Sequence, residues 1–184
     1  MAIVIVMGLP GAGKSTVLAA VPERRKDYVI RNGGDMMSSI AIAKKYVDHR
    51  DKVRAMPQEK QKEIQAEMFN SLSQEKGKII FDTHSAIKTP EGYLIGIPHD
   101  RIPSLDIAGF IYITAPPEQI FERRQLDTSR KRDDDNVEKL REHDMKNIEY
   151  ILNYSKMAKA PVIIIQNLKN ELSKAQEQFL SFLP

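Results

Sequence analysis

The sequence contains no cysteine, and this absence excludes two ways of stabilising a small protein. Without cysteine among its 184 residues, the chain can form neither disulfides nor thiolate metal sites. The four histidines are scattered and do not have the spacing of metal ligands, so nothing indicates a structural metal. A cysteine-free chain suits a reducing compartment, and we expect the protein to be cytoplasmic.

Long hydrophobic runs and a strong charge of one sign are lacking as well. The apolar stretch over residues 2–7 is too short to cross a bilayer and runs directly into a glycine-rich loop. We interpret it as a core strand and expect no membrane association. The 28 basic and 25 acidic residues leave a net charge of +3. So small an excess favours anionic ligands without indicating a nucleic-acid partner, and we expect none.

What the chain does contain is a complete phosphate-binding pattern. Residues 8–15 read Gly-Leu-Pro-Gly-Ala-Gly-Lys-Ser, which fits G-x-x-x-x-G-K-[ST] between an apolar strand and a helix-forming segment. The glycines allow backbone N–H groups to point into one concavity, and the helix N-terminus adds partial positive charge. We expect Lys14 to reach the β- and γ-phosphates and the Ser15 hydroxyl to bind Mg²⁺. The pattern therefore predicts binding of a nucleoside triphosphate.

The rest of the chain alternates between predicted strands and predicted helices. Short runs rich in branched side chains predict five strands, at residues 2–7, 28–30, 78–82, 108–113 and 161–165. Predicted helices separate them, at about 14–21 (ended by Pro22), 36–49, 57–77, 116–125, 136–157 and 170–182. This alternation predicts a single α/β domain with three layers, α/β/α, around a five-stranded parallel sheet. Residues 83–104, rich in proline and glycine, are predicted to form a long loop.

Several polar segments directly follow the predicted strands. They begin at Gly8, Gly33, Asp82 and Gln166, and parallel sheets bind ligands at the carboxyl ends of their strands. We therefore expect these segments to converge on one crevice. Asp82 ends an apolar strand, where the magnesium-organising Asp of phosphate-loop proteins lies. The alternative is an ordinary strand-end Asp that caps a loop.

Two groups of arginines are candidates for binding phosphate. Arg123, Arg124, Arg130 and Arg132 lie within a charged segment, and arginine can grip phosphoryl oxygens in bidentate fashion. The alternative is a solvated turn in which Asp133–Asp135 pair with the arginines. Arg50 and Arg54 indicate a second anion site after the helix that follows Gly33, although they could equally be favourable cations at a helix C-terminus.

These motifs together resemble those of the archaeal-type adenylate kinases, within the nucleoside monophosphate kinases. The resemblance covers nearly the whole chain and rests on GLPGAGKST, NGGDMM, HRDKVRAMPQEKQ, FDTHSAIKTPEGYLIGIP, RRQLDTSRKRDDD and IIIQN. The DTHS-to-GIP block is the most diagnostic, because bacterial and eukaryotic adenylate kinases usually carry D-G-[FY]-P-R there. The chain also lacks their longer lid insertion.

This resemblance implies a P-loop NTPase architecture of the nucleoside monophosphate kinase type. It implies one domain with a monophosphate-binding helical part at about 33–75 and a short lid at about 123–136. The implied reaction is ATP + AMP ⇌ 2 ADP with Mg²⁺ as cofactor, ATP and AMP as substrates and a homotrimer as the assembly.

The resemblance also implies three sets of site residues. The donor phosphates would be held by Gly8, Pro10, Gly11, Ala12, Gly13, Lys14, Ser15 and Thr16, with the Asn167 backbone near the donor base. The monophosphate would be lined by Gly34, Asp35, Met36, Arg54, Thr83 and His84. The catalytic groups would be Lys14, Asp82 and the lid arginines Arg124, Arg130 and Arg132, with Arg141 as a further candidate. Ser15 would hold Mg²⁺ directly and Asp82 would hold it through water.

Two other functions are compatible with the phosphate loop. One keeps the fold but transfers the phosphoryl group to another nucleoside monophosphate or a small metabolite, since few residues decide which base is read. The other is a nucleotide switch or an ATPase that works with a protein or RNA partner. A Ras-like switch is disfavoured because N-K-x-D is absent and DxxG occurs only at 106–109, before a strand. The arginine cluster favours a kinase, which must exclude water to avoid hydrolysis.

Overall fold

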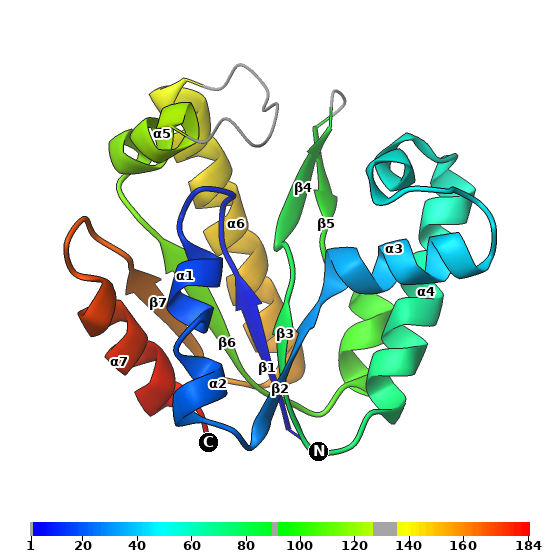
Figure 1. Ribbon diagram of the computed structural model, residues 1–184, viewed down its shortest axis with the longest axis horizontal. Helices are drawn as coiled ribbons and strands as arrows, with labels where there is room; N and C mark the ends of the chain where they lie inside the picture. The colour runs from blue at the N-terminus through cyan, green and yellow to red at the C-terminus, as the bar shows by residue number, and fades with distance from the viewer. Residues whose placement is uncertain (1, 90–91, 127–135) are drawn as a thin grey trace.

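A sheet of parallel strands lies at the centre of the computed structural model, which describes residues 2–89, 92–126 and 136–184. The strand order is β2-β3-β1-β6-β7, and Figure 1 shows the five strands side by side. Their bounds are β1 (Ala2–Met7), β2 (Tyr28–Asn32), β3 (Lys78–Asp82), β6 (Ile107–Thr114) and β7 (Val162–Gln166). All neighbouring pairs are parallel. The predicted five-stranded parallel sheet is therefore confirmed.

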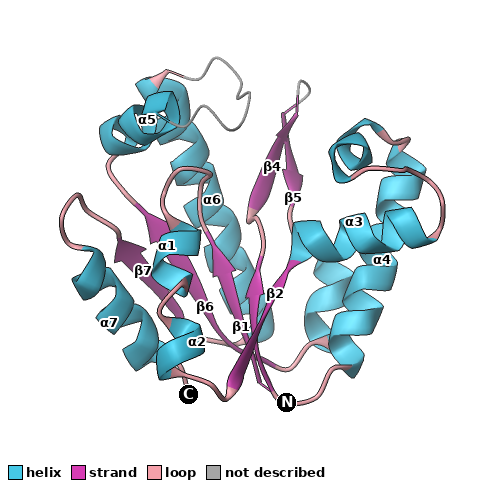
Figure 2. Ribbon diagram, viewed as in Figure 1, coloured by secondary structure: helices cyan, strands magenta, loops and turns pink. Residues whose placement is uncertain are grey.

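Helices cover both faces of this sheet, as Figure 2 shows. One face is covered by α1 (Lys14–Leu18), α2 (Val21–Arg24) and α7 (Leu172–Phe182). The other is covered by α3 (Gly33–Ala43), α4 (Gln58–Gln74) and α6 (Val137–Ala158). The remaining helical segments are α5 (Pro117–Leu126) and the 3₁₀ helices η1 (Arg50–Ala55) and η2 (His99–Ser104). The predicted three-layer α/β/α architecture is confirmed. No helix in the described ranges is long and apolar enough to span a membrane.

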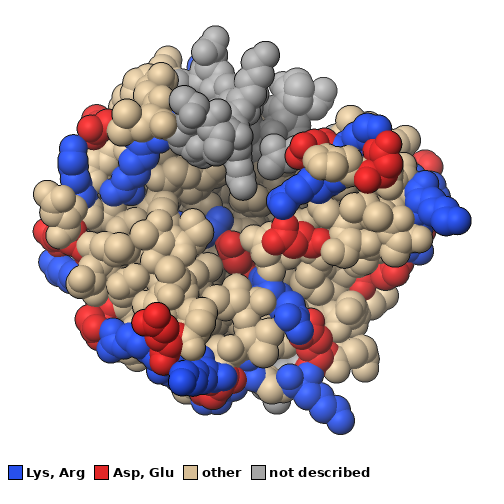
Figure 3. All heavy atoms as spheres, in the orientation of Figure 1, with Lys and Arg blue, Asp and Glu red and all other residues tan. Residues whose placement is uncertain are grey.

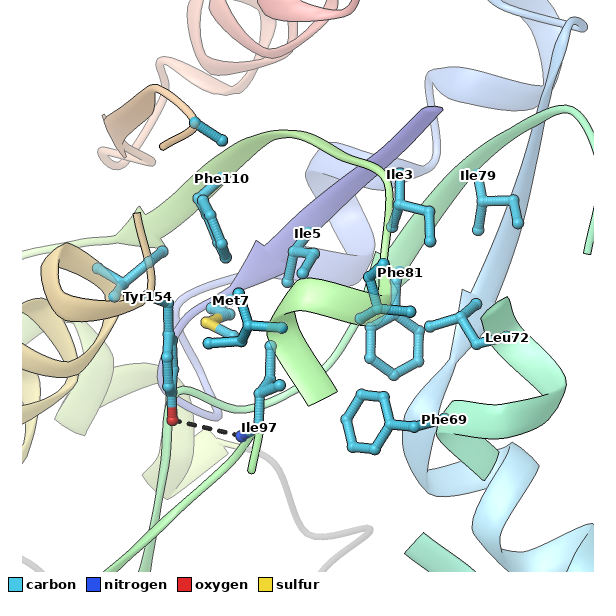
Figure 4. Packing of buried hydrophobic residues seen from close by; sticks show 14 of the residues in the cluster. Ile3, Ile5, Met7, Phe69, Leu72, Ile79, Phe81, Ile97, Phe110 and Tyr154 are labelled. Atoms are coloured by element: carbon cyan, nitrogen blue, oxygen red, sulfur yellow. Dashed lines mark hydrogen bonds between the residues drawn. The ribbon is translucent and has the colours of Figure 1, made fainter. Parts of the chain in front are cut away.

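The central strand β1 is buried on both sides, which explains its continuous apolar sequence. Ile3, Ile5 and Met7 point toward the core beneath α4 and α6, where Figure 4 shows them packed near Phe81 and Tyr154. Val4 and Val6 point to the opposite face and pack against residues of α1 and α7. These five of the six β1 side chains are fully buried. This alternation fixes the strand register, because a shift by one residue would exchange the two cores.

The predicted long loop over residues 83–104 is wrong. It contains the strands β4 (Ala86–Thr89) and β5 (Gly92–Ile95), which pair in antiparallel fashion outside the main sheet, and then η2. Partners distant in sequence hold the base of this hairpin. The Asn147 side-chain oxygen accepts hydrogen bonds from the Ala86 N–H (3.0 Å) and the Ser85 hydroxyl (2.9 Å). A strand of four residues carries too little local signal to be recognised without such contacts.

Some predicted helix boundaries also need correction. Pro22 does not end a helix, because it occupies the first turn of α2, where proline is tolerated. The helix predicted over 36–49 begins at Gly33 instead, where the Asn32 side chain caps it, and ends at Ala43. The helix predicted to run up to Gly77 ends at Gln74. Lys45, which follows α3, has a left-handed conformation that prevents α3 from continuing.

Candidate functional site

The phosphate-binding loop joins β1 to α1 at the carboxyl edge of the sheet (Figure 1). The chain leaves β1 toward β2 and leaves β3 toward β6, so the crossovers depart in opposite directions from these neighbouring strands. Such a switch point creates a crevice in which ligands bind. Figure 3 shows a hollow near the middle of this view, between the part that contains α1 and the part that contains α3.

Two glycines of the loop are required by the close approach of other groups. Gly13 precedes α1 with φ 87°, and a Cβ there would overlap the side-chain amide of Asn167. A Cβ on Gly8 would overlap the backbone oxygen of Ile113. Glycine removes both clashes and tolerates the left-handed conformation at Gly13. The loop is therefore confined between β6 and the segment that follows β7.

Lys14 and Asp82 form an ion pair across the crevice. The Lys14 Nζ lies 3.2 Å from Asp82 Oδ1 and 3.4 Å from the Gly8 carbonyl oxygen. Only 13% of the Lys14 side chain and 14% of the Asp82 side chain are exposed. The register of β1 and β3 places Val6 beside Asp82, which explains why the two groups meet. A triphosphate entering the loop would take Lys14 as its cation and leave Asp82 facing the ligand.

Asp82 has the properties of a magnesium-organising carboxylate. Its Oδ1 is buried and, among the described residues, pairs with Lys14 without accepting a hydrogen bond. No group of three or more His, Cys, Asp or Glu side chains that could hold a metal ion by itself occurs in the described ranges. Mg²⁺ in phosphate-binding sites usually keeps several waters and takes one or two protein oxygens besides the phosphates. The Asp82 oxygen that becomes spare if Lys14 turns to a phosphate, and the exposed Ser15 hydroxyl in the first turn of α1, fit that ion.

Asn32 connects Asp82 to the start of α3. Its side-chain Nδ2 donates to Asp82 Oδ2 (2.8 Å), while its Oδ1 accepts from the Asp35 N–H (3.1 Å). Asn32 and Asp82 are aligned in the register of β2 and β3. Sequence reasoning missed this residue, although an Asn immediately before a helix is a favoured N-cap. The phosphate-binding loop and the start of α3 are thus joined by one chain of contacts.

The predicted acceptor residues gather around the same helix start. Asp35 forms an exposed ion pair with Arg50 (3.1 Å), and the Gly34 carbonyl accepts from the Ser38 hydroxyl (2.7 Å). Met36 is partly buried against the core beneath α4. Thr83 and His84 follow β3, and the Thr83 N–H donates to the Val6 carbonyl (3.0 Å). These side chains come from α3 and from the turn after β3.

Three further predicted residues, Thr16, Asn167 and Arg124, lie in or beside the phosphate loop. Thr16 is exposed, and its carbonyl accepts a hydrogen bond from Gln176 in α7 (3.1 Å). The Asn167 N–H donates to the Thr114 carbonyl (2.7 Å), and its side chain donates to the Ala12 carbonyl (2.9 Å). Arg124 Nε donates to the Pro10 carbonyl (2.8 Å). Sequence reasoning expected the Asn167 backbone near the donor base and missed the contact of its side chain with the loop.

Part of the predicted lid falls outside the described residues. Arg130 and Arg132 lie within 127–135, outside the described ranges, and of Arg54 only the backbone, in η1, is described. Arg141 lies in α6 and forms an ion pair with Glu118 of α5 (2.8 Å). Two of the predicted arginines are therefore assigned no position, and a third no side-chain position.

A polar contact beneath the loop attaches α6 to β6. Asp144 accepts hydrogen bonds from the Tyr112 hydroxyl (2.7 Å) and the Thr114 hydroxyl (3.0 Å). Burial, reinforced by the negative charge of Asp144, raises the pKa of Tyr112 far above its ordinary value. Tyr112 therefore stays neutral, keeps its proton and donates a hydrogen bond to Asp144. This contact holds the long helix against the strand that ends beside the phosphate loop.

Fold and site together define a P-loop kinase. A family model described as an AAA domain matches residues 7–141. Among solved structures, the shikimate kinase of Bacteroides thetaiotaomicron is similar with a TM-score of 0.61, covering 98% of this chain and 97% of that one at 10% identity. The shikimate kinase of Acinetobacter baumannii is similar with a TM-score of 0.58, covering 98% and 90% at 15% identity. At such low identity these two structures show the fold alone.

Relatives in sequence narrow the class. The adenylate kinase of Methanothermobacter thermautotrophicus is 36% identical over 185 residues, covering the whole of both chains. That of Methanopyrus kandleri is 36% identical over 97% of this chain and 95% of its own, and that of Pyrococcus abyssi is 34% identical over 98% and 94%. The chain belongs to the family of archaeal adenylate kinases, as its sequence motifs predicted.

Proposed function

We propose that the protein transfers a phosphoryl group reversibly between adenine nucleotides, ATP + AMP ⇌ 2 ADP, with Mg²⁺. One observation carries this proposal. Lys14 contacts Asp82 (3.2 Å), Asp82 contacts Asn32 (2.8 Å), and Asn32 contacts the start of α3 (3.1 Å), so the phosphate loop is linked to a second polar region. An ATPase needs only the phosphate loop, whereas a kinase also needs a second region that binds the acceptor.

On the donor side, each residue of the loop has a distinct role. The backbone from Gly8 to Thr16 cradles the phosphates, and Lys14 neutralises charge on the β- and γ-phosphates. Ser15 would hold Mg²⁺, and Asp82 would hold it through water. When bound, the ion neutralises charge that develops on the phosphate oxygens. Its fit rests on the spare Asp82 oxygen and the exposed Ser15 hydroxyl.

On the acceptor side, AMP lies with its phosphate toward Lys14. The residues in contact with it are Gly34, Asp35, Met36, Arg54, Thr83 and His84. The start of α3 offers positive partial charge to the acceptor phosphate, because the first N–H groups of a helix have no partner within the helix. Phosphoryl transfer then needs alignment of two phosphates more than a covalent group of the protein.

The chain is one domain in which two parts close over the crevice. Residues 33–75 form the monophosphate-binding part, and residues 123–136 form the lid. Arg124, Arg130 and Arg132 bring positive charge to the transferring group and help to exclude water. One well-placed arginine can raise the rate by roughly 10³–10⁵-fold in related reactions.

Resemblance to the family supports a proposal about assembly and location. We propose that the protein forms a homotrimer in the cytoplasm and acts on ATP and AMP without a nucleic-acid or membrane partner. Exposed apolar side chains on α6, among them Met145 and Leu152, offer surface that an assembly could bury. Sedimentation equilibrium at micromolar concentration tests this, since a monomer mass at all concentrations would contradict the trimer.

A product assay tests the proposed reaction. Mg-ATP is incubated with AMP, GMP, CMP, UMP or no acceptor, and the nucleotides are separated and quantified. We expect ADP to form rapidly with AMP, two molecules for each ATP consumed. Equal ADP formation without an acceptor would identify an ATPase, and preference for another monophosphate would identify a different kinase of the same fold.

A further inference from the structure

Arg123, on α5, holds the outer side of the phosphate loop. Its NH1 donates to the Ala12 carbonyl (3.3 Å), and its NH2 donates to the Asn167 carbonyl (2.8 Å). The Asn167 side-chain amide donates to the same Ala12 carbonyl (2.9 Å). One peptide oxygen of the loop thus accepts two hydrogen bonds from groups that belong to α5 and to the segment after β7.

The two donors are themselves fixed in a frame. Gln119 of α5 accepts from the Lys169 N–H (3.0 Å) and from Arg123 NH2 (3.4 Å). The Asn167 N–H donates to the Thr114 carbonyl at the end of β6 (2.7 Å). Figure 1 shows α5 and the end of β7 on the same side of the loop between β1 and α1. The frame is therefore built by elements that surround the loop from outside.

The hydrogen bonds to the Ala12 carbonyl also set the direction of the Gly13 N–H. In a trans peptide the carbonyl and the following N–H point in opposite directions. Holding the Ala12 carbonyl outward therefore aims the Gly13 N–H inward, toward the phosphates. Gly13 has φ 87°, and glycine offers little resistance to rotation of that peptide. Arg124, which donates to the Pro10 carbonyl (2.8 Å), constrains the Gly11 N–H in the same way.

We propose that Arg123 is a positioning residue which, together with Asn167, fixes the Ala12–Gly13 peptide in the orientation that binds donor phosphates. This deepens the proposed function, because it assumes that the donor phosphates lie in the loop. It makes the affinity of the loop depend on α5, the helix that leads into the proposed lid. Arg123 thereby acts through the backbone of the loop and not through the base of the nucleotide.

Two ligands distinguish action of Arg123 through the loop backbone from action through the nucleotide base. Binding of Mg-ATP and of inorganic tripolyphosphate with Mg²⁺ is measured by calorimetry on the whole protein and on Arg123→Ala. Hydrogen bonds from charged donors are worth about 10–100-fold in binding, so we expect both affinities to fall by a common factor in that range. Arg123→Lys, with one donor group, should recover part of both. Arg24→Ala, which removes an exposed arginine paired with Glu177, is the control and should change neither.

Other results would overturn the inference. A loss with Mg-ATP alone would mean that Arg123 contacts the base, and unchanged affinities would mean that the loop holds its shape without it. If Arg123→Ala does not fold, Asn167→Ala removes the other donor to Ala12 and should weaken both ligands equally. Where both variants fold, their double variant should lose less than the product of the single losses, because they share one acceptor. Intact binding without transfer to AMP would contradict the proposed function alone.

Discussion

Lys14 and Asp82 are the two charged groups whose burial is hardest to explain without a ligand. Each is about 14% exposed or less, and they neutralise one another at 3.2 Å. Removing one partner of a buried pair leaves the other charge uncompensated, yet Asp82 would keep its hydrogen bond from Asn32. If a triphosphate binds as proposed, Lys14 can therefore exchange Asp82 for the phosphates while Asp82 keeps one partner.

Replacement of Lys14 tests the donor side. We expect Lys14→Ala to lower kcat for ADP formation by roughly 10²–10³-fold or more, the effect of losing a donor that stabilises developing charge. The circular dichroism spectrum should stay that of the folded protein, since Lys14 faces the crevice. An unimpaired Lys14→Ala enzyme would remove the basis of the donor assignment.

Replacement of Asn32 tests the link between the two sides. Asn32→Ala removes a helix cap and a hydrogen bond to Asp82, so we expect the free energy of unfolding to fall by about 1 kcal/mol. The KM for AMP should rise more than the KM for Mg-ATP. Asn32→Ser is the matched variant, because serine keeps the cap and lacks the amide donor. Equal stability loss in both variants would contradict the capping role, and equal KM changes for both substrates would contradict the link.

A side chain of α6 holds the base of the hairpin β4–β5. The buried hydroxyl of Tyr154 donates to the Ser85 carbonyl (2.9 Å) and accepts from the N–H groups of Gly96 (3.0 Å) and Ile97 (3.3 Å). Figure 4 shows the bond to Ile97 at the edge of the apolar core. One side chain thus satisfies three backbone groups at both ends of the hairpin.

Loss of that hydroxyl should loosen the hairpin. For Tyr154→Phe we expect the free energy of unfolding to fall by about 1–3 kcal/mol, the cost of leaving the buried Ile97 N–H without its partner. The Ser85 carbonyl and the Gly96 N–H keep their bond to each other (2.9 Å). Hydrogen exchange at Gly96 and Ile97 should accelerate, most strongly at Ile97. Tyr150→Phe is the control, on the same helix with its ring stacked 6.4 Å from that of Tyr154. Unchanged exchange at the two amides would show that other groups hold the hairpin.

The contact between Glu63 of α4 and Tyr46, in the segment after α3, should weaken as pH falls. The Tyr46 hydroxyl and then Lys60 lower the pKa of the Glu63 carboxyl from its ordinary 4.5 to about 2. A lowered pKa stabilises the folded state above the unfolded value, so this contribution is lost as pH falls from about 4.5 toward 2. Acid unfolding of Glu63→Gln should show a shallower dependence on pH across that range. An identical dependence would mean that the exposed contact contributes nothing.

Local patterns of the chain predicted the sheet and the phosphate loop but not the contacts between distant segments. The loop motif and the apolar run before it are contiguous, so their structure follows from neighbouring residues. The bond from Asn32 to Asp82 depends instead on the register of β2 and β3, and the hairpin depends on Asn147 and Tyr154. In the sequence, Arg123 is one member of a charged run, and only the structure shows its hydrogen bond to the Ala12 carbonyl oxygen.

Ligand binding should stabilise the protein as a unit, because the crevice is built from both sides of the sheet. At 100 times its Kd, Mg-ATP should add about 2.7 kcal/mol to the free energy of unfolding. For a chain of 184 residues this corresponds to a rise of roughly 5–10 °C in Tm. Differential scanning calorimetry measures the shift, and EDTA should reduce it. Lys14→Ala, which lacks the phosphate cation, should show little of it, and a full shift in that variant would contradict the site.

The strand order has a consequence for how the chain acquires its fold. β1 is synthesised before β3 and β6, yet it lies between them in the sheet. Its two hydrogen-bonding edges stay unpaired until Lys78–Asp82 and Ile107–Thr114 have been made. Parallel pairing between such distant segments is slow and exposes the chain to aggregation. The strand that carries the phosphate loop is thus made before both of the strands that enclose it.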